Sequence, residues 1–316
     1  MENIYITSAL RTAVGSIGKS LKNISADKLG SEVILKNIED SKISNIDVDE
    51  IVMGQVLTGG TGQNPARQAA IRSGIPKEKP AYIVNQVCGS GIRSVVSGYQ
   101  SIKSKDSKIV VAGGQESMSL APHSVHLRDG KKLGDVEITD TLIKDGLWDA
   151  FHGYHMGVTA ENVAEKFQVT REEQDKFALR SQEKAIKAQK EDKFKDEIIN
   201  FKIKSKKAEI IFNTDEHPRE GVNLDTLSRL KPVFKNEGTV TAGNASGIND
   251  GAAAVTLMSD DEANKRGIKK LVSIRSWASC GVDPALMGTG PIPSSKKALE
   301  LARWDIKDVD LFEINE

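Results

Sequence analysis

The chain has 316 residues, of which 38% are hydrophobic, and its 44 Lys and Arg residues balance 44 Asp and Glu residues, so the formal net charge is 0. This balance argues against a protein that binds nucleic acid through bulk charge, although it leaves a local basic patch open, and the two cysteines provide no disulfide framework. The N-terminus has no signal-peptide pattern, and no apolar run reaches the roughly 18 residues that a membrane span needs. We therefore expect a cytoplasmic α/β protein of more than one domain, with neither nucleic acid nor a membrane as a partner.

Strand and helix patterns alternate through the first 117 residues. Apolar runs predict strands at 4–7, 51–57, 81–84 and 108–114, and amphipathic runs predict helices at 25–40, 64–74 and 92–102. Such alternation is typical of a layered domain, so we expect helices packed on a mainly parallel sheet.

The pattern changes after Ser117. Residues 118–155 are loop-like, and helices are predicted at 159–168 and 170–189. The second of these helices opens with Thr170-Arg-Glu-Glu173, a capping-box pattern. This change of character predicts an inserted segment with a fold of its own.

We predict three parts from these patterns. Residues 118–247 form the inserted loop domain, and residues 1–117 with 248–268 form the N-terminal domain. Residues 269–316 begin a further domain, with a β-rich start at 271–275 and a strand at 310–316.

Cys88 stands in Asn85-Gln-Val-Cys-Gly-Ser-Gly91, between a predicted strand and a predicted helix. The positive end of a helix dipole favours a thiolate, and the glycines allow a ligand to come close. Because the thiolate is the nucleophilic form of cysteine, Cys88 is a candidate nucleophile. The alternative is a cysteine that only fills the core, since free cysteines are among the most buried residues.

Other candidates each have two interpretations. His155 is a ligand contact or an ordinary loop histidine, and Arg219 holds a phosphate or is a surface arginine. Asn315 orients a carbonyl group or caps a helix, whereas Cys280 is expected to be a packing residue. The small residues at 239–254 form a backbone wall for a ligand or allow close packing. Two H-x-x-H pairs lack further ligands at suitable spacing, so we expect no metal site.

Four motifs, in order along the chain, resemble the signatures of the thiolase family. They are Asn85-Gln-Val-Cys-Gly-Ser-Gly91, Tyr154-His-Met-Gly-Val-Thr-Ala-Glu-Asn-Val163, Gly243-Asn-Ala-Ser-Gly-Ile-Asn-Asp-Gly-Ala252 and Phe312-Glu-Ile-Asn-Glu316. The resemblance extends along the whole chain. Because of His155-Met156, it is strongest to the biosynthetic class, the acetyl-CoA acetyltransferases or acetoacetyl-CoA thiolases.

The resemblance implies an α/β thiolase fold, with two βαβαβαββ halves in a layered αβαβα arrangement and the second half incomplete in this chain. It implies that the loop domain binds coenzyme A and supplies contacts of a homotetramer, a dimer of dimers. The implied activity is that of an acyltransferase, 2 acetyl-CoA = acetoacetyl-CoA + CoA, by Claisen condensation or thiolysis through an acyl-Cys88 intermediate. Acetyl-CoA, acetoacetyl-CoA and coenzyme A are then substrates, and no cofactor is expected.

The same resemblance assigns roles to residues. Cys88 is implied to be the nucleophile, its backbone N–H to contribute to one oxyanion hole, and Asn315 to hold a water in another. Met156 and Met287 are implied to close the acyl pocket, which favours short chains. The residues implied to line the coenzyme A tunnel are Leu147, His155, Met156, Arg219, Ala242 and Ser246.

In one respect the chain departs from the family pattern. Family members continue into a Gly-His-Pro segment, whose histidine activates the nucleophile, and a Cys-x-Gly-Gly-Gly segment, whose cysteine moves a proton of the methyl group; neither occurs in the 316 residues. We therefore expect a C-terminally incomplete sequence of reduced activity, since loss of a general base costs about 10²–10⁴ in rate. The alternatives are a non-catalytic acyl-CoA-binding fragment, a split subunit completed by another chain, a longer-chain 3-ketoacyl-CoA thiolase, or a related Claisen enzyme such as a ketoacyl synthase.

Overall fold

A computed structural model describes residues 3–204 and 209–315 of the chain. The chain packs into two compact units. Unit 1 comprises Met1–Gly146, Phe194–His217 and Ile248–Ile274, and unit 2 comprises Leu147–Lys193, Pro218–Gly247 and Arg275–Glu316. Within the described ranges, no helix combines the length and the apolar character needed to cross a membrane.

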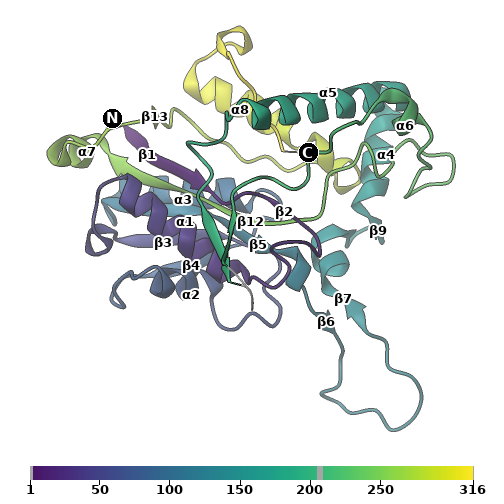
Figure 1. Cartoon of the computed structure of the whole chain (residues 1–316), viewed down its shortest axis with the longest axis horizontal. Coiled ribbons are helices and arrows are strands. Elements are labelled where there is room, and N and C mark those ends of the chain that lie inside the picture. Colours follow the sequence, from purple (N-terminus) through teal and green to yellow (C-terminus); the bar gives the residue numbers. More distant parts are fainter. Residues whose placement is uncertain (1–2, 205–208, 316) are drawn as a thin grey trace. The chain divides into compact units, whose positions relative to one another are not determined.

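Unit 1 is built on a seven-stranded sheet (Figure 1). Its strands follow the order β13-β1-β12-β5-β3-β4, and β2 pairs with β12. The strands are β1 (Ile4–Arg11), β2 (Gly15–Ser16), β3 (Glu50–Gly54), β4 (Ala81–Val84), β5 (Ile109–Ser117), β12 (Asn249–Ser259) and β13 (Val272–Ser273).

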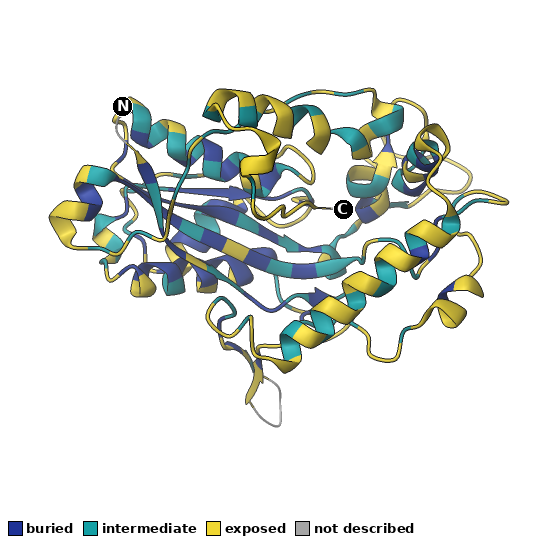
Figure 2. Ribbon diagram, turned by 90° about the horizontal axis from the view of Figure 1, so that it is seen from above, coloured by how far each residue is buried: buried dark blue, intermediate teal, exposed yellow. Residues whose placement is uncertain are grey.

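Helices cover both faces of this sheet, because successive residues of a buried strand point to opposite sides. Ile51 and Met53 of β3 belong to the apolar cluster that α1 (Ala26–Asp40) and α2 (Pro65–Arg72) share. Val52, between them, belongs to the cluster of α3 (Ser90–Ser104). Figure 2 shows the buried residues concentrated along the strands of this sheet.

The prediction of a mainly parallel sheet was wrong. Only the pairs β3–β4 and β3–β5 are parallel among the described pairings of this sheet, whereas β12 runs antiparallel to both β1 and β5. The physical reason is that β12 lies more than 100 residues after β5 in the chain and enters the sheet between β1 and β5. Local periodicity carries no information about such a long-range pairing.

The remaining elements of unit 1 are short. They are the 3-10 helices Asn45–Asp47 and Met118–Leu120, β6 (His123–Ser124), β7 (Thr139–Asp140), β10 (Phe201–Lys204), β11 (Glu209–Phe212) and α7 (Asp260–Arg266). Arg11 of β1 ties the segment after residue 193 to the sheet, donating to Glu197 at 2.7 Å and to the two oxygens of Asp215 at 2.8 and 3.1 Å. A π-helix, Leu142–Leu147, ends at the junction of the two units.

Unit 2 is mainly helical. It contains the hairpin of β8 (Trp148–Asp149) and β9 (Tyr154–His155), and the helices α4 (Met156–Phe167), α5 (Arg171–Lys190), α6 (Leu224–Ser228) and α8 (Pro291–Ala302), with 3-10 helices at Pro284–Thr289 and Ile306–Asp308. The predicted capping box at Thr170 and Glu173 is confirmed at the start of α5. The helix predicted at 159–168 begins earlier, at Met156, because the His155 side chain caps it by accepting from the Gly157 N–H.

The strand predicted at 310–316 was wrong within the described residues, since 310–315 are irregular. A strand needs backbone partners for its N–H and C=O groups, and β-rich composition alone does not supply them. The predicted β-rich start at 271–275 is present in part, as β13, which pairs with β1 at the edge of the large sheet.

Candidate active site

Cys88 is exposed in the turn between β4 and α3, and we call residues 85–91 the cysteine turn. Ser90 holds this turn from within. Its Oγ accepts from the Gln86 N–H at 2.8 Å and donates to the Val87 carbonyl at 2.5 Å. Asn85 Oδ1 accepts from the Val87 N–H at 2.9 Å. The conformation before Cys88 is therefore fixed by two neighbouring polar side chains.

Val87 adopts a left-handed backbone conformation with φ of 48°. For a β-branched residue this is an outlier, which costs roughly 1–3 kcal/mol and persists only where the surroundings over-determine it. The hydrogen bonds of Asn85 and Ser90 provide that constraint. Strain of this kind adjoining an exposed thiol is typical of a functional turn.

Glycines let the start of α3 rest directly on the sheet. A Cβ at Gly54 would lie 2.5 Å from the Ser90 carbonyl carbon and 2.7 Å from the Gly91 nitrogen. A Cβ at Gly114, on β5, would lie 3.5 Å from the Gly91 Cα. Only a residue without a side chain fits at Gly54, so β3 fixes the height of the cysteine turn above the sheet.

The cysteine turn borders a cavity of about 330 Å³ within unit 1. Its lining comes from the cysteine turn and from the ends of β1, β3, β5 and β12: Arg11, Thr12, Val14, Gly54, Gln55, Val56, Val87, Cys88, Ser90, Gly91, Gly114, Gln115, Glu116, Gly251, Ala252 and Ala253. Many of these residues are small, so backbone forms much of the wall. Such a cavity admits an extended group close to the sulfur.

Glu116 is the carboxylate of this cavity. It accepts from the N–H groups of Val56 and Leu57 at 2.8 and 3.2 Å. Burial raises the pKa of Glu116, the two N–H donors oppose that rise, and the nearby charge of Asp250 adds to it. Glu116 therefore positions the segment after β3 at the cavity, and sequence analysis had not singled it out.

All the other predicted site residues lie in unit 2. His155 Nδ1 accepts from the Gly157 N–H at 3.0 Å, which leaves the proton on Nε2, and its ring stacks on Phe234 with centroids 4.6 Å apart. Burial lowers the pKa of His155. The structure thus presents a neutral imidazole with an available N–H donor directly before Met156, the first residue of α4.

A second histidine, His152, lies on the same hairpin and was not predicted. Its Nδ1 lies 2.7 Å from Asp149 Oδ2, and its ring stacks on Tyr154 with centroids 5.4 Å apart. Burial opposes ionisation of Asp149, but hydrogen bonds from the Phe151 N–H and from His152 outweigh it and lower the pKa of Asp149. The hairpin before α4 is therefore fixed by a buried carboxylate.

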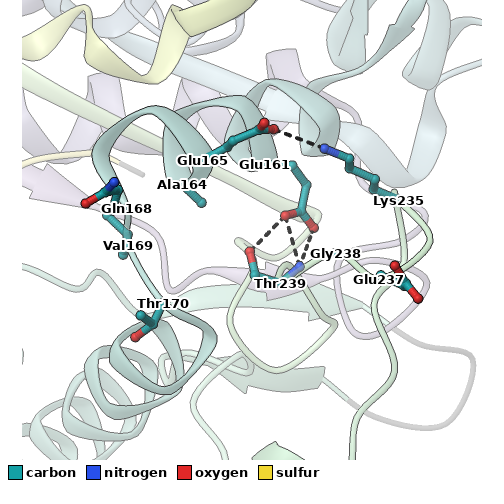
Figure 3. Close-up of a pocket in the computed structure, with 10 residues that line it drawn as sticks. All are labelled: Glu161, Ala164, Glu165, Gln168, Val169, Thr170, Lys235, Glu237, Gly238 and Thr239. Carbon is teal, nitrogen blue, oxygen red and sulfur yellow. Dashed lines mark hydrogen bonds and ion pairs between the residues drawn. The ribbon is translucent and has the colours of Figure 1, made fainter.

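Ala242 and Ser246 lie in residues 239–247, which we call the wall loop. Both are exposed, whereas Val240 and Thr241 at the start of the loop are buried. The start of the loop is therefore buried within unit 2, whereas Ala242 and Ser246 are accessible to a ligand. Glu161 of α4 accepts hydrogen bonds from the start of this loop (Figure 3).

The remaining predicted residues are spread over unit 2. Leu147 is half-buried at the end of the π-helix, and Met287 is 38% exposed in the 3-10 helix that packs on α4. Arg219 is exposed, and its backbone N–H donates to Gln182 Oε1 at 2.8 Å. Asn315 is exposed in the irregular segment 310–315.

A cavity of about 370 Å³ lies beside the Glu161 contact (Figure 3). It is bordered by the second half of α4 and by residues 235–239. Glu165 and Lys235 form an ion pair of 3.1 Å there. No three His, Cys, Asp or Glu side chains gather as metal ligands anywhere in residues 3–204 and 209–315.

Comparison with known proteins identifies two family models along the chain. The model described as "Thiolase, N-terminal domain" matches residues 4–261, and the one described as "Thiolase, C-terminal domain" matches residues 268–316.

Individual proteins match over nearly the whole chain. The acetyl-CoA acetyltransferase of Rhizobium meliloti (strain 1021) is 56% identical over 314 residues, which are 99% of this chain and 80% of the relative. The cytosolic acetyl-CoA acetyltransferase of Rattus norvegicus is 50% identical over 315 residues, which are 99% of this chain and 79% of the relative. The crystal structure of the Bacillus anthracis acetyl-CoA acetyltransferase superposes with a TM-score of 0.96 at 39% identity, covering 98% of this chain and 79% of that one.

Proposed function

Because the chain belongs to the thiolase family and has the thiolase fold, we propose that it is an acetyl-CoA acetyltransferase whose nucleophile is Cys88. The observation that carries this proposal is the exposed thiol in a strained, glycine-seated turn beside a cavity. Relatives named acetyl-CoA acetyltransferase, 56% and 50% identical over nearly the full chain, support it.

The proposed chemistry has two halves. In the first, the Cys88 thiolate attacks the thioester carbonyl of acetyl-CoA, the C–S bond to coenzyme A breaks, and coenzyme A leaves as the thiol after taking up a proton. In the second, the methyl carbon of another acetyl-CoA loses a proton, attacks the acetyl-Cys88 carbonyl and expels the Cys88 thiolate, which gives acetoacetyl-CoA. Thiolysis is the reverse of these steps.

Within this proposal, the Cys88 N–H and a water on Asn315 stabilise oxyanions of the two halves. Leu147, His155, Met156, Arg219, Ala242 and Ser246 contact coenzyme A, and the available Nε2–H of His155 supports its part in this set. Met156 and Met287 close the acyl pocket. We therefore expect acetoacetyl-CoA to be cleaved faster than an eight-carbon-scale 3-ketoacyl-CoA, and the opposite order would assign the protein to the longer-chain thiolases.

The direct test is transfer of an acetyl group to the protein. The protein is incubated with acetyl-CoA, and the Cys88 peptide is examined by mass spectrometry. We expect one acetyl group on Cys88, none in Cys88→Ser, and undiminished labelling in Cys280→Ser, which removes the other thiol. Thiolysis of acetoacetyl-CoA should fall at least about 10³-fold in Cys88→Ser.

The outcomes separate the candidate functions. Coenzyme A binding without acetylation would indicate a non-catalytic binding protein. Acetylation that persists in Cys88→Ser would show that another residue is the nucleophile.

The proposal extends to assembly and location. We infer a homotetramer, supported by apolar side chains exposed between β6 and β7, of which Leu133 is 93% exposed. Light scattering after gel filtration tests this, and a monomer would contradict it.

The cytosolic relative supports a cytoplasmic location. The division into residues 1–117 with 248–268, 118–247 and 269–316 stays a prediction.

A further inference from the structure

Glu161 connects α4 to the start of the wall loop. Its side chain is buried, with 4% of the residue exposed. One oxygen accepts from the Thr239 N–H at 2.8 Å, and the other accepts from Thr239 Oγ1 at 2.8 Å and from the same N–H at 2.9 Å (Figure 3). The first oxygen also accepts from the Val240 N–H at 2.8 Å. Bonds to a charged acceptor are roughly twice as strong as neutral ones, so this carboxylate is a firm anchor for the loop.

A second buried carboxylate holds the middle of the same loop. Asp175 of α5 is 3% exposed, and its Oδ1 accepts from Asn244 Nδ2 at 2.9 Å while its Oδ2 accepts from Arg171 Nε at 2.8 Å. Asn244 also accepts from the Thr241 N–H at 2.8 Å and donates to the Thr239 carbonyl at 3.1 Å. Asp175 therefore anchors the loop through Asn244, which is also hydrogen-bonded to the backbone of Thr239 and Thr241.

Glu161 and Asp175 hold the two segments that contain the proposed coenzyme A contacts, namely the start of α4 and the wall loop. His155 and Met156 stand at the start of α4, and Glu161 lies on the same helix. Ala242 and Ser246 belong to the wall loop, between and beyond the two anchored points. The carboxylate of Glu161 thus links two segments that are distant in sequence but are expected to bind one ligand.

We propose that Glu161 and Asp175 are positioning residues that hold the wall loop in the conformation that binds coenzyme A. This inference rests on the proposed function and adds to it two residues that do not themselves contact substrate. A carboxylate suits this position because neither of its oxygens carries a hydrogen, and the Thr239 N–H lies within hydrogen-bond distance of both, at 2.8 and 2.9 Å.

The first experiment replaces one anchor without changing its shape. In Glu161→Gln the amide NH₂ faces the Thr239 N–H in either orientation of the amide, because that N–H reaches both carboxylate oxygens, so the loop start moves away. We expect the Kd for coenzyme A, measured by calorimetry, to rise about tenfold. The matched control is Glu165→Gln, one turn further along α4, where an exposed carboxylate pairs with Lys235; its Kd should stay within about twofold.

A rescue experiment distinguishes positioning from general stability. Asp175→Asn places an amide opposite the Asn244 amide and should weaken coenzyme A binding. Adding Asn244→Asp restores an amide–carboxylate pair with the roles exchanged, although the new carboxylate no longer donates to the Thr239 carbonyl. The double variant should therefore bind coenzyme A more tightly than Asn244→Asp alone, in which two carboxylates face each other. If it binds no better than Asn244→Asp, the hydrogen bond is not what positions the loop and the proposal fails.

Two further measurements keep this proposal separate from the proposed function. The rate of Cys88 alkylation by iodoacetamide, without coenzyme A present, should be the same in Glu161→Gln and in the unmodified protein. Equal losses of alkylation, thermal stability and affinity would show a purely structural role and overturn the inference. Unmodified protein that binds coenzyme A but never acetylates Cys88 would overturn the proposed function and leave the positioning result standing.

Discussion

The cysteine turn and the wall loop are held in place by opposite means. In the cysteine turn, neutral side chains at Asn85 and Ser90 bond to backbone groups two to four residues away. In the wall loop, two buried carboxylates reach backbone and amide groups 69 to 79 residues away. The short turn is fixed by its own sequence, whereas the longer wall loop has internal hydrogen bonds of Asn244 and is anchored in addition by carboxylates on α4 and α5.

The two regions also differ in the kind of unfavourable feature that each contains. The cysteine turn keeps backbone strain at Val87, and the wall loop keeps buried charge at Glu161 and Asp175. Both are unfavourable in isolation and persist because hydrogen bonds offset their cost. Substitutions in one region should therefore leave the other unchanged, and the following predictions test that separation.

The largest effect is expected for Gly54→Ala. Its new Cβ would meet the backbone of Ser90 and Gly91, which cannot turn aside, so we expect a loss of about 1–3 kcal/mol in the free energy of unfolding. Cys88 alkylation should change while coenzyme A affinity is retained. Gly91→Ala is the control, because nothing lies within 4 Å of its new Cβ; urea denaturation should place it within about 0.5 kcal/mol of the unmodified protein.

A comparable but smaller loss is expected for Gly157→Ala in unit 2. Its Cβ would lie 2.2 Å from the Phe234 ring, and a ring can turn further than a backbone can. Turning it disrupts the stack on His155, so the Kd for coenzyme A should rise while Cys88 alkylation stays unchanged.

Gly288→Ala is the control for that variant, since its nearest neighbour, Val163, lies at an ordinary 3.8 Å. Slower alkylation of Cys88 in Gly157→Ala would contradict the independence of the two regions.

At position 87 a glycine variant should be more stable than an alanine variant, which is the reverse of the usual order. Elsewhere alanine is usually more stabilising than glycine, but a left-handed residue other than glycine costs roughly 1–2 kcal/mol. Val87→Gly should therefore be about 1 kcal/mol more stable than Val87→Ala in urea denaturation. An alanine variant that equals or exceeds the glycine variant would show that the turn is not strained.

The smallest effect concerns pH. Burial lowers the pKa of His155 in the folded protein below its ordinary value near 6.5, so the unfolded chain binds this proton more readily. The contribution of His155 to stability is therefore complete above about pH 6.5 and is lost as the pH falls through the folded-state pKa. Protonation also turns Nδ1 into a donor and breaks its bond with the Gly157 N–H.

His155→Phe cannot titrate. We expect the difference in unfolding free energy between the unmodified protein and this variant to shrink as the pH is lowered from 7 to 5, about the range in which histidine titrates. A difference that does not vary with pH would show that His155 is not held neutral.

The features that could be predicted from the sequence are those with local causes. Helix α2 was expected over 64–74 and runs over Pro65–Arg72, because a proline at the first turn and an apolar stripe define it. The cysteine turn was found because a strand, glycines and a helix adjoin Cys88. In contrast, the place of β12 in the sheet depends on pairing with strands more than 100 residues away, which periodicity does not encode.

Glu161 was missed for a related reason, although a signal existed. Gly157, Glu161 and Ala164 are all buried, and their spacing puts them on one face of α4. A carboxylate in line with two small residues indicates a buried acceptor, but its partners at Thr239 and Val240 cannot be read from the helix. The strain at Val87 could not be expected either, because valine is a residue type that avoids such a conformation.

The position of β12 has a consequence for how the protein is made. β1 is synthesised before the other strands described, yet Ile4 pairs with Ser259 and Tyr5 with Ser273. At ribosomal speeds of about 5–20 residues per second, the first strand waits roughly 10–50 s for its neighbours. During that time its apolar side chains and unpaired edges are open to other chains in the cell. Yield of this protein should therefore depend on chaperone supply and on translation speed more than on the stability of its finished sheet.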